Sequence, residues 1–485
     1  MTEVSPVPEL GPIDNVSYNY RNVPTQQELI ELIRETLNSL IEHYLALRPS
    51  YARMVELQKL YDGVLAQVTA MSNSFQTSLS QFEGARQSLE GITSDGFKMP
   101  TNGDDASQTL QSAVSVAATH RHRRVQLRAG TYSLNLGVTL STPGMVLEGE
   151  GDATIIRGNA FFYLKANDVV FRNMKFSGTS AANIAQLFKT DSTDRQFKNI
   201  RFENCTFENI GLWCGWVGAP TVDNAGVFGV LNNATGLRSH VEVDHCKFYG
   251  FGADGAVWMR GVDHATVNRC EFYNIGTPAN GSVQMTGDMC KFSYLARGGK
   301  ITHNHFHDGY RDAIDLYDSQ GVLVDGNYME NMGVCAIEAK FHSKEHRVGQ
   351  HTIINNRARN VETANTSQYT VAYQLAVSES IIMGNMIKES NGTGFRFGGA
   401  QDNSDDWMQN STIVGNYAQN LTGHGFSMTG VKYSVMANNI SKNNSLRGFY
   451  VPSDTATGIV GKNQNISVGN GFVDEWTAAA PTPIP

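Results

Sequence analysis

Six related octapeptides recur through the middle of this chain: VVFRNMKF (169–176), IRFENCTF (200–207), VEVDHCKF (241–248), ATVNRCEF (265–272), GKITHNHF (299–306) and VLVDGNYM (322–329). Looser copies follow as TIINNRA, IIMGNMI, TIVGNYA, VMANNIS and IVGKNQN. Alternate residues of each copy are apolar, which is typical of a short strand with one buried face. The smallest steps between copies are 23 to 24 residues. A repeat of this length predicts a solenoid, because one strand must stack on its neighbours to bury its apolar face.

The repeat length also predicts the kind of solenoid. About 23 residues suffice for three short strands and three turns, which make one coil of a parallel β-helix. Longer steps, such as the one from Cys205 to Cys246, indicate coils with loops inserted on one face. Stacked coils lie about 4.8 Å apart, so equivalent residues of successive coils should form ladders.

Two ladders are expected inside the coils. The eighth residue of the octapeptide predicts an aromatic stack of Phe176, Phe207, Phe248, Phe272 and Phe306. The sixth position predicts a second ladder of Met174, Cys205, Cys246, Cys270, Asn304, Asn327, Asn356, Asn385, Asn416, Asn439 and Asn463. An inward asparagine ladder can satisfy its amides by hydrogen bonds along the stack and to backbone.

Composition excludes several classes of function. The 485 residues carry a net charge of −8, and no basic stripe suggests a nucleic-acid partner. The N-terminus lacks the pattern of a signal peptide, and no apolar run reaches the length of a membrane span. The six cysteines include no CxxC pair, so we expect neither a zinc site nor a disulfide framework. We therefore expect no metal, no cofactor, no membrane insertion and synthesis in a cytoplasm.

Residues 25–95 read as helical. Thr25 and Glu28 form a capping box, apolar residues then recur in steps of three and four, and Pro49 interrupts the pattern. The seam resumes with Tyr61, Val64, Val68, Met71 and Phe75. A solitary helix of this kind would be poorly soluble. A multimeric coiled coil, most plausibly a trimer, is one explanation, and a hairpin folded on its own body is the other.

Residues 104–158 resemble a known protein family. The order GDDASQTLQSAV, VQLRAGTYSL and MVLEGEGDATIIRG resembles the opening of the pectate-lyase-like superfamily of right-handed β-helices, in which an N-terminal helix caps the core. With the helical stem, the chain resembles bacteriophage tailspikes and related virion spikes. That resemblance implies side-by-side trimers that bind bacterial surface polysaccharide and often cleave it. The fold class expected is mainly β, a right-handed parallel β-helix with an N-terminal α-helical coiled-coil stem.

The domain organisation follows from these elements. We expect a virion attachment segment at 1–24, a helical oligomerisation stem at 25–95, a β-helix with its capping helix at 96–465, and a C-terminal tail at 466–485.

Candidate chemistry lies on one outward row. Apolar residues Val257, Ile314, Ile337, Phe395, Phe426 and Phe449 align in successive coils, and the residue after each should face outward. This gives a surface row of Trp258, Asp315, Glu338, Arg396, Ser427 and Tyr450, with Arg260, Tyr317 and Lys340 two positions further along.

Asp315 and Glu338 are the candidate catalytic pair. They lie 23 residues apart, so their side chains should stack about 5 Å apart, a separation that suits retaining glycoside hydrolysis. Two alternatives remain open. One is a lyase, in which Lys340, His342 and Arg396 would hold a uronic carboxylate and Tyr317 would donate the proton. The other is a pair of solvated surface carboxylates neutralised by Lys340 and Arg396.

Three histidines, His303, His305 and His307, alternate in HNHFHDGYRD. Such spacing could bind a transition metal, but the same row holds ordinary exposed residues in the preceding coil. We expect a solvated face there, with His305 as a sugar contact and no metal.

The sequence therefore predicts a homotrimeric virion spike on a phage tail or head. Its N-terminus would bind tail or capsid proteins, and its β-helix would bind capsule or O-antigen polysaccharide for host recognition, with depolymerisation left open. One alternative is a non-catalytic receptor-binding spike. Another is a free bacterial polysaccharide lyase or epimerase.

Overall fold

The computed structural model divides the chain into two compact units, Met1–Arg86 and Gln87–Pro485. The structure describes residues 26–45, 51–90, 92–93, 97–158, 162–178, 188–190, 198–210, 212–215, 240–250, 256–276, 287–293, 296–340, 349–361, 371–398, 408–451, 458–461, 464–472 and 474–476.

The first unit is helical. Helix α1 spans Gln26–Leu45 and helix α2 spans Tyr51–Glu90, with Pro49 between them in the sequence. Several apolar side chains of α2 are exposed, among them Val64, Met71 and Phe75. No described helix has the length and apolarity needed to cross a membrane.

A capping helix lies near the start of the second unit. Helix α3 (Ser107–Ala117) buries Leu110, Val114 and Ala117 on the end of the apolar core. Asp105 fixes its start, since Oδ1 accepts hydrogen bonds from the Ser107 backbone N–H (3.0 Å) and hydroxyl (2.5 Å).

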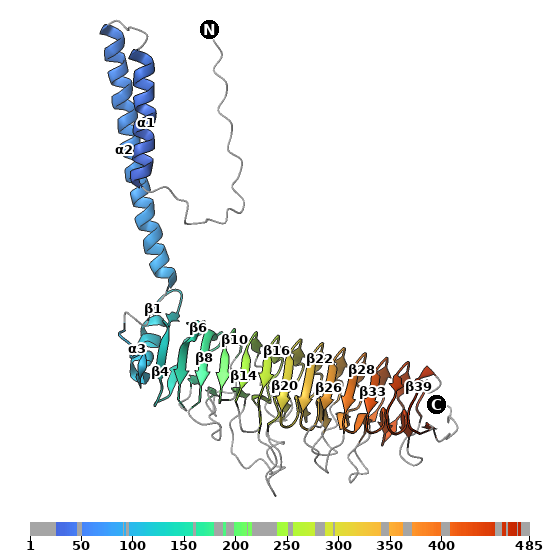
Figure 1. The fold of residues 1–485 in the computed structure, drawn as a ribbon. Coiled ribbons are helices and arrows are strands. Elements are labelled where there is room, and N and C mark those ends of the chain that lie inside the picture. The colour runs from blue at the N-terminus through green and yellow to red at the C-terminus, as the bar shows by residue number, and fades with distance from the viewer. Residues whose placement is uncertain are drawn as a thin grey trace. The chain divides into compact units, whose positions relative to one another are not determined.

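The rest of this unit is a stack of parallel strands in three ladders (Figure 1). The first ladder contains β1 (Ile92–Thr93), β3 (Arg124–Gln126), β6 (Val146–Arg157), β8 (Val170–Ser177), β10 (Ile200–Glu203), β13 (Val241–Asp244), β16 (Thr266–Asn268), β19 (Lys300–Thr302), β22 (Leu323–Asp325), β25 (Thr352–Ile354), β28 (Ile381–Met383), β32 (Thr412–Val414) and β36 (Val435–Ala437).

The second ladder shares the long strands β6 and β8 with the first. Its other strands are β2 (Asn102–Asp105), β4 (Gly130–Ser133), β11 (Thr206–Glu208), β14 (Lys247–Tyr249), β17 (Glu271–Tyr273), β20 (His305–Gly309), β23 (Tyr328–Met332), β26 (Arg357–Val361), β29 (Met386–Ser390), β33 (Tyr417–Leu421), β37 (Ile440–Lys442) and β39 (Ile466–Val468).

The third ladder is a separate ten-stranded sheet. It contains β12 (Leu212–Gly215), β15 (Val257–Arg260), β18 (Cys290–Ser293), β21 (Ile314–Tyr317), β24 (Ile337–Lys340), β27 (Val371–Leu375), β30 (Thr393–Phe397), β34 (Phe426–Met428), β38 (Phe449–Val451) and β40 (Glu475–Trp476). Two small sheets complete the unit, β5 (Val138–Leu140) with β7 (Phe162–Leu164) and β9 (Phe188–Thr190), and β31 (Met408–Gln409) with β35 (Val431–Lys432).

A stack of phenylalanine rings runs up the interior, as predicted. Phe176, Phe207, Phe248, Phe272 and Phe306 are fully buried, and consecutive ring centroids lie 4.6 to 5.0 Å apart. Each ring therefore packs face to face with the equivalent ring of the next coil, which is possible only when the coils are in register.

The asparagine ladder lies beside this stack. The Asn356 amide Nδ2 donates to Oδ1 of Asn385 (2.9 Å) and to the carbonyl of Val324 (3.0 Å). Its Oδ1 accepts the backbone N–H (3.1 Å) and the amide N–H (2.8 Å) of Asn327. The same pattern repeats from Asn304 to Asn465, so these buried amides are satisfied along the stack.

A left-handed residue precedes each ladder asparagine from Asn304 to Asn439. Asn355 has φ +57°, and Gly326, at the same position one coil earlier, has φ +66°. Asparagine and glycine tolerate this region better than other residues, which explains why the phrase carries Asn-Asn or Gly-Asn at this point.

The end of the ladder corrects the sequence prediction. Asn465, not Asn463, follows Asn439, because both the backbone and the amide of Asn439 donate to Asn465 Oδ1 (2.9 Å each). Asn463 lies outside the described residues. Strands β39 and β40 continue the second and third ladders to Trp476, so the β-helix extends beyond residue 465. The final copy, IVGKNQN, contains both Asn463 and Asn465, so its sequence alone does not show which asparagine continues the ladder.

One buried histidine begins a series of side chains that accept backbone hydrogen bonds in the turns before the first ladder's strands. His351 Nδ1 accepts the Val322 backbone N–H (3.2 Å), while Ser380, Ser411 and Ser434 serve the equivalent role in later coils (3.1 Å each). Burial lowers the pKa of His351 from 6.5 to about 4, since the charged imidazolium would be desolvated.

This histidine should make the protein sensitive to acid. Between pH 6.5 and 4 the unfolded chain binds a proton at His351 and the folded chain does not, so the free energy of unfolding should fall by about 3 kcal/mol. His351→Ser, which supplies the hydroxyl used in the next coils, should remove that loss. Urea unfolding at pH 7 and pH 4.5 measures it, with exposed His240→Ser as control. An unchanged pH dependence in His351→Ser contradicts this account.

Candidate functional site

The predicted outward row exists, and its register is as expected. Asp315 pairs directly with Glu338, and Ile314 with Ile337, between β21 and β24. The row also includes two residues that the sequence alignment missed. Lys291 stands between Trp258 and Asp315, and Gln374 stands between Glu338 and Arg396.

The two candidate acids are buried, which the sequence did not predict. Asp315 is 0% exposed and Glu338 is 4% exposed, although their strand neighbours Ile314 and Leu316 point into the apolar core. The expectation of a surface row is therefore wrong at these positions, and the solvated-carboxylate alternative fails with it. The acids must be compensated by charges within the protein.

Lysines supply part of that compensation. Lys291 Nζ lies 2.8 Å from Asp288 Oδ2 and 2.8 Å from Asp315 Oδ2. Lys340 Nζ lies 2.5 Å from Glu338 Oε2. The contact of Lys291 with Asp315 is a charge contact, because neither oxygen of Asp315 receives an aligned hydrogen bond from the described residues. Nearby carboxylates raise the pKa of Lys340, against the opposing effect of its own burial.

Two further buried acids, Asp288 and Asp312, lie in the turns before β18 and β21. Arg311 Nε lies 3.4 Å from Asp288 Oδ1 and 3.6 Å from Asp312 Oδ2, and Asp312 Oδ1 accepts the Cys335 backbone N–H (3.0 Å). Burial raises the pKa of Asp312 well above its ordinary value, and the neighbouring Glu338 and Asp288 carboxylates raise it further.

Four buried carboxyl groups and three cations thus lie together here. We refer to these residues as the acid cluster: Asp288, Asp312, Asp315 and Glu338 with Lys291, Arg311 and Lys340.

Aromatic rings flank the lysines of the acid cluster. Lys291 Nζ lies 5.6 Å from the ring centre of Trp258 and 5.8 Å from that of Tyr317, and Lys340 Nζ lies 5.7 Å from Tyr317. Trp258 Nε1 donates to Ser293 Oγ (2.6 Å). Trp258, Tyr317 and Lys340 are partly exposed, so they form a rim above the buried acids. The structure thus unites five of the predicted site residues.

The other predicted residues are not part of this group. Arg396 and Tyr450 lie two and four strands beyond Glu338 in the same row, about 10 and 19 Å away at the strand spacing. Arg396 contacts Gln374 (3.5 Å), and Tyr450 stacks on His424 (4.6 Å). His305 lies on β20 in the second ladder, on a different sheet.

Two predicted residues cannot be placed in the site. His342 and the side chain of Arg260 lie outside the described residues.

A sequence signal for the missed residues exists. Both DMCK (288–291) and DAID (312–315) place an aspartate two residues before the inward apolar position and a charged residue just after it. The strand CKFS (290–293) follows an insertion. It begins with cysteine, whereas the other strands of the outward row have an aliphatic or aromatic residue at that position.

Comparison with known proteins agrees with this architecture. The family model for the right-handed β-helix region matches residues 226–404. The fold is a right-handed parallel β-helix. No curated protein matches it in sequence.

Solved β-helix structures resemble it at low identity. The pre-mature gene product 12 of bacteriophage phi29 is 14% identical with a TM-score of 0.52, over 82% of this chain and 58% of that one. PfbA, a surface adhesin of Streptococcus pneumoniae, is 13% identical with a TM-score of 0.50, over 79% and 93%. The A-module of the Azotobacter vinelandii mannuronan C-5 epimerase AlgE6 is 13% identical with a TM-score of 0.46, over 79% and 99%. At these identities the likeness establishes the fold alone.

The acid cluster should be essential to the stability of this part of the β-helix. Lys291→Met removes the cation between Asp288 and Asp315 and leaves their buried charge uncompensated, so it should lower the free energy of unfolding by about 3 to 5 kcal/mol at pH 7. Urea unfolding of the variant and of the unsubstituted protein at pH 7 measures the loss.

A matched control is Arg359→Met. Arg359 forms a 2.6 Å ion pair with Glu389, but both side chains are about half exposed. This substitution should cost less than about 1 kcal/mol. Equal losses in the two variants would contradict a special role for the acid cluster.

Proposed function

We propose that this protein is a virion-associated spike that binds a bacterial surface polysaccharide, either capsule or O-antigen, at the rim of the third ladder. The observation that carries the proposal is the partly exposed rim of Trp258, Tyr317 and Lys340 above the buried acid cluster. Aromatic rings pack against the C–H faces of sugars, and a charged amine binds sugar hydroxyls or carboxylates. A row of such groups along parallel strands suits an extended polymer.

The helical unit supports the placement on a virion. Exposed apolar residues along α2, with Met71 at 71% exposure, need a partner that covers them. In this proposal the α2 helices of three copies form a coiled coil that buries these apolar side chains. Residues 1–24 bind tail or capsid proteins.

Depolymerisation is a second candidate function, and a specific observation favours it. Burial and the Glu338 carboxylate raise the pKa of Asp312, and Asp315 and Glu338 stand in direct register on adjacent strands. An acid whose pKa is raised by burial and by neighbouring carboxylates is a feature that glycoside hydrolysis uses. The burial of these acids and their lysine contacts favour binding without cleavage, and require that the site open before any reaction.

Binding should depend on the rim aromatics. Tyr317→Ala removes a ring beside two lysines, so we expect at least tenfold weaker binding to purified host polysaccharide, measured by biolayer interferometry. Tyr417→Ala is the matched control, because Lys388 Nζ lies 5.6 Å from the Tyr417 ring in another sheet. Equal effects of the two substitutions would refute the assignment of the site.

The same preparation separates the two functions. Reducing ends released by the protein, and lost in Glu338→Gln, would identify a hydrolase, and absorbance of unsaturated uronate would identify a lyase. Binding with neither product identifies a receptor-binding spike.

The stem should set the oligomeric state. Native mass spectrometry of the full chain should give three times 53.1 kDa. Val64→Glu combined with Met71→Glu places like charges in the seam, so it should shift the mass to that of one chain. Gln67→Glu, on an exposed position of the same helix, should not. A single-chain mass for the unsubstituted protein would exclude the trimer.

A further inference from the structure

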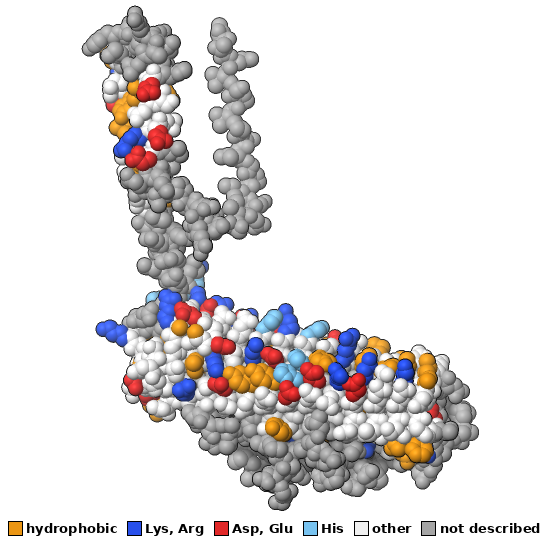
Figure 2. All heavy atoms as spheres, in the orientation of Figure 1, with side chains coloured by type: hydrophobic (Ala, Val, Ile, Leu, Met, Phe, Trp, Pro, Cys, Tyr) orange, Lys and Arg blue, Asp and Glu red, His pale blue; other side chains and the backbone are white. Residues whose placement is uncertain are grey.

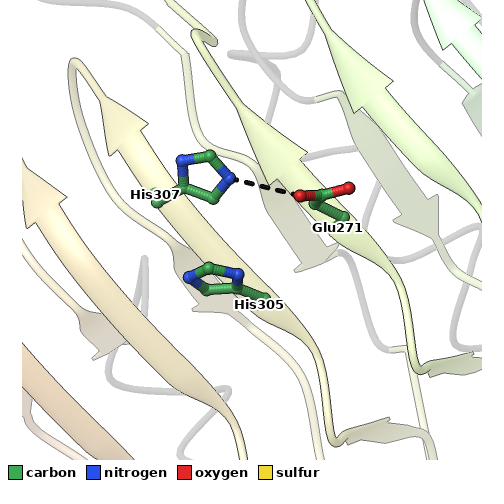
Figure 3. Close-up of side chains that lie close together, drawn as sticks. All are labelled: Glu271, His305 and His307. Atoms are coloured by element: carbon green, nitrogen blue, oxygen red, sulfur yellow. Dashed lines mark ion pairs between the residues drawn. The ribbon is translucent and has the colours of Figure 1, made fainter.

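We propose that Glu271, His305 and His307 form a zinc site on the open face of the second ladder (Figure 3). Each residue offers one ligand atom, and the three atoms lie within 4.8 Å of one another. Within the described part of the chain, this is the one group of three such residues that meets this geometry. It departs from the sequence expectation of a solvated face without metal.

The strands position the three side chains. His305 and His307 flank Phe306 on β20, and Phe306 is buried in the aromatic stack, so both imidazoles project from the opposite side. Glu271 pairs with His305 in the register of β17 and β20. Figure 2 shows histidine and acidic side chains gathered on this face of the β-helix.

The distances are close to those of a coordination sphere. His307 Nε2 lies 3.6 Å from Glu271 Oε1. Two ligands of a tetrahedral zinc ion, each bound at about 2.0 to 2.1 Å, stand about 3.3 Å apart. Small rotations of partly exposed side chains would therefore bring the three atoms onto one ion. Two protein histidines and one carboxylate leave a fourth position open.

Neighbouring groups orient the ligands. His307 Nδ1 lies 2.8 Å from Asp308 Oδ2, and Asp308 also accepts the Asn331 amide (2.8 Å). When Nδ1 donates to Asp308, Nε2 presents a lone pair toward the Glu271 carboxylate, and two acceptors then face each other. A cation between them resolves this conflict. A carboxylate that holds the second nitrogen of a metal-bound histidine is a common arrangement at zinc sites.

Contacts on both sides hold the site in place. Lys247 pairs with the other oxygen of Glu271 (Oε2, 3.2 Å), which leaves Oε1 toward His307. Glu330 Oε1 lies 3.3 Å from His305 Nε2 and holds that ring from the next coil. Tyr273 stacks on His307 with ring centres 5.2 Å apart. Borderline donors of this kind, two imidazoles and a carboxylate, suit Zn²⁺ better than Mg²⁺ or Ca²⁺.

Titration calorimetry with zinc chloride tests the proposal on the full-length protein after treatment with a chelator. We expect one tightly bound ion per chain, and His305→Asn combined with His307→Asn should weaken its binding at least a hundredfold. Glu271→Gln should weaken it at least tenfold. Asp308→Asn should weaken it by about tenfold, through loss of the orienting hydrogen bond.

The control is a second pair of histidines. His240 and His264 stack with ring centres 5.2 Å apart on the first ladder, outside the proposed group. His240→Gln combined with His264→Gln should bind zinc like the unsubstituted protein.

Circular dichroism is used to check that each variant folds. The rise in melting temperature on addition of zinc is a second measure of binding. Intense visible absorption of the cobalt-loaded protein, lost in the His305 and His307 variant, would support a tetrahedral site. Equal zinc affinity in that variant and in the control, or no zinc binding by the unsubstituted protein, would overturn the proposal.

Discussion

The structure depends on one repeated hydrogen-bond pattern, in which each buried asparagine from Asn304 to Asn439 donates to the next asparagine and to a backbone carbonyl. A ladder shifted by one residue would bury unpaired amides in each of these coils, and each would cost about 1 to 3 kcal/mol. The aromatic stack could tolerate some sliding, because apolar contacts are not directional. The asparagine ladder therefore fixes the register, and the left-handed turn residues before it fix the direction of the chain.

Register has functional consequences on the third ladder. Lys291, Asp315 and Glu338, which follow one another at steps of 24 and 23 residues, become direct neighbours there. Their charges would be expensive to bury one at a time, and they are tolerated because each acid has a cation on its own or an adjacent coil. A rigid, internally neutralised base then holds Trp258 and Tyr317 in fixed positions, which reduces the entropy lost when a ligand binds. The same register on the second ladder brings Glu271 beside two histidines.

The sequence predicted the fold well because the repeated octapeptide varies least at the positions that are buried in the core. From this repeat we predicted the parallel strands, the phenylalanine stack and the pairing of Asp315 with Glu338. It failed where copies are loose, at Asn463, and where a strand follows an insertion, at Lys291 and Gln374. Burial of the acids could not be predicted, since strand alternation tells which way a side chain points but not what lies over it. The raised pKa of Asp312 likewise arises first from its burial and then from Glu338 and Asp288, which no motif links to it.

Engineered disulfides test the central claim, the register of successive coils. Thr352 and Ile381 are direct partners on β25 and β28, both accessible, and adjacent strands lie within the reach of a disulfide. Thr352→Cys with Ile381→Cys should form a disulfide rapidly under mild oxidation, as detected by mass spectrometry of peptides. Thr352→Cys with Met383→Cys, displaced by two residues and about 8 Å apart, should not. Rapid bonding of the displaced pair, with none in the direct pair, would contradict the register on which the fold and both sites depend.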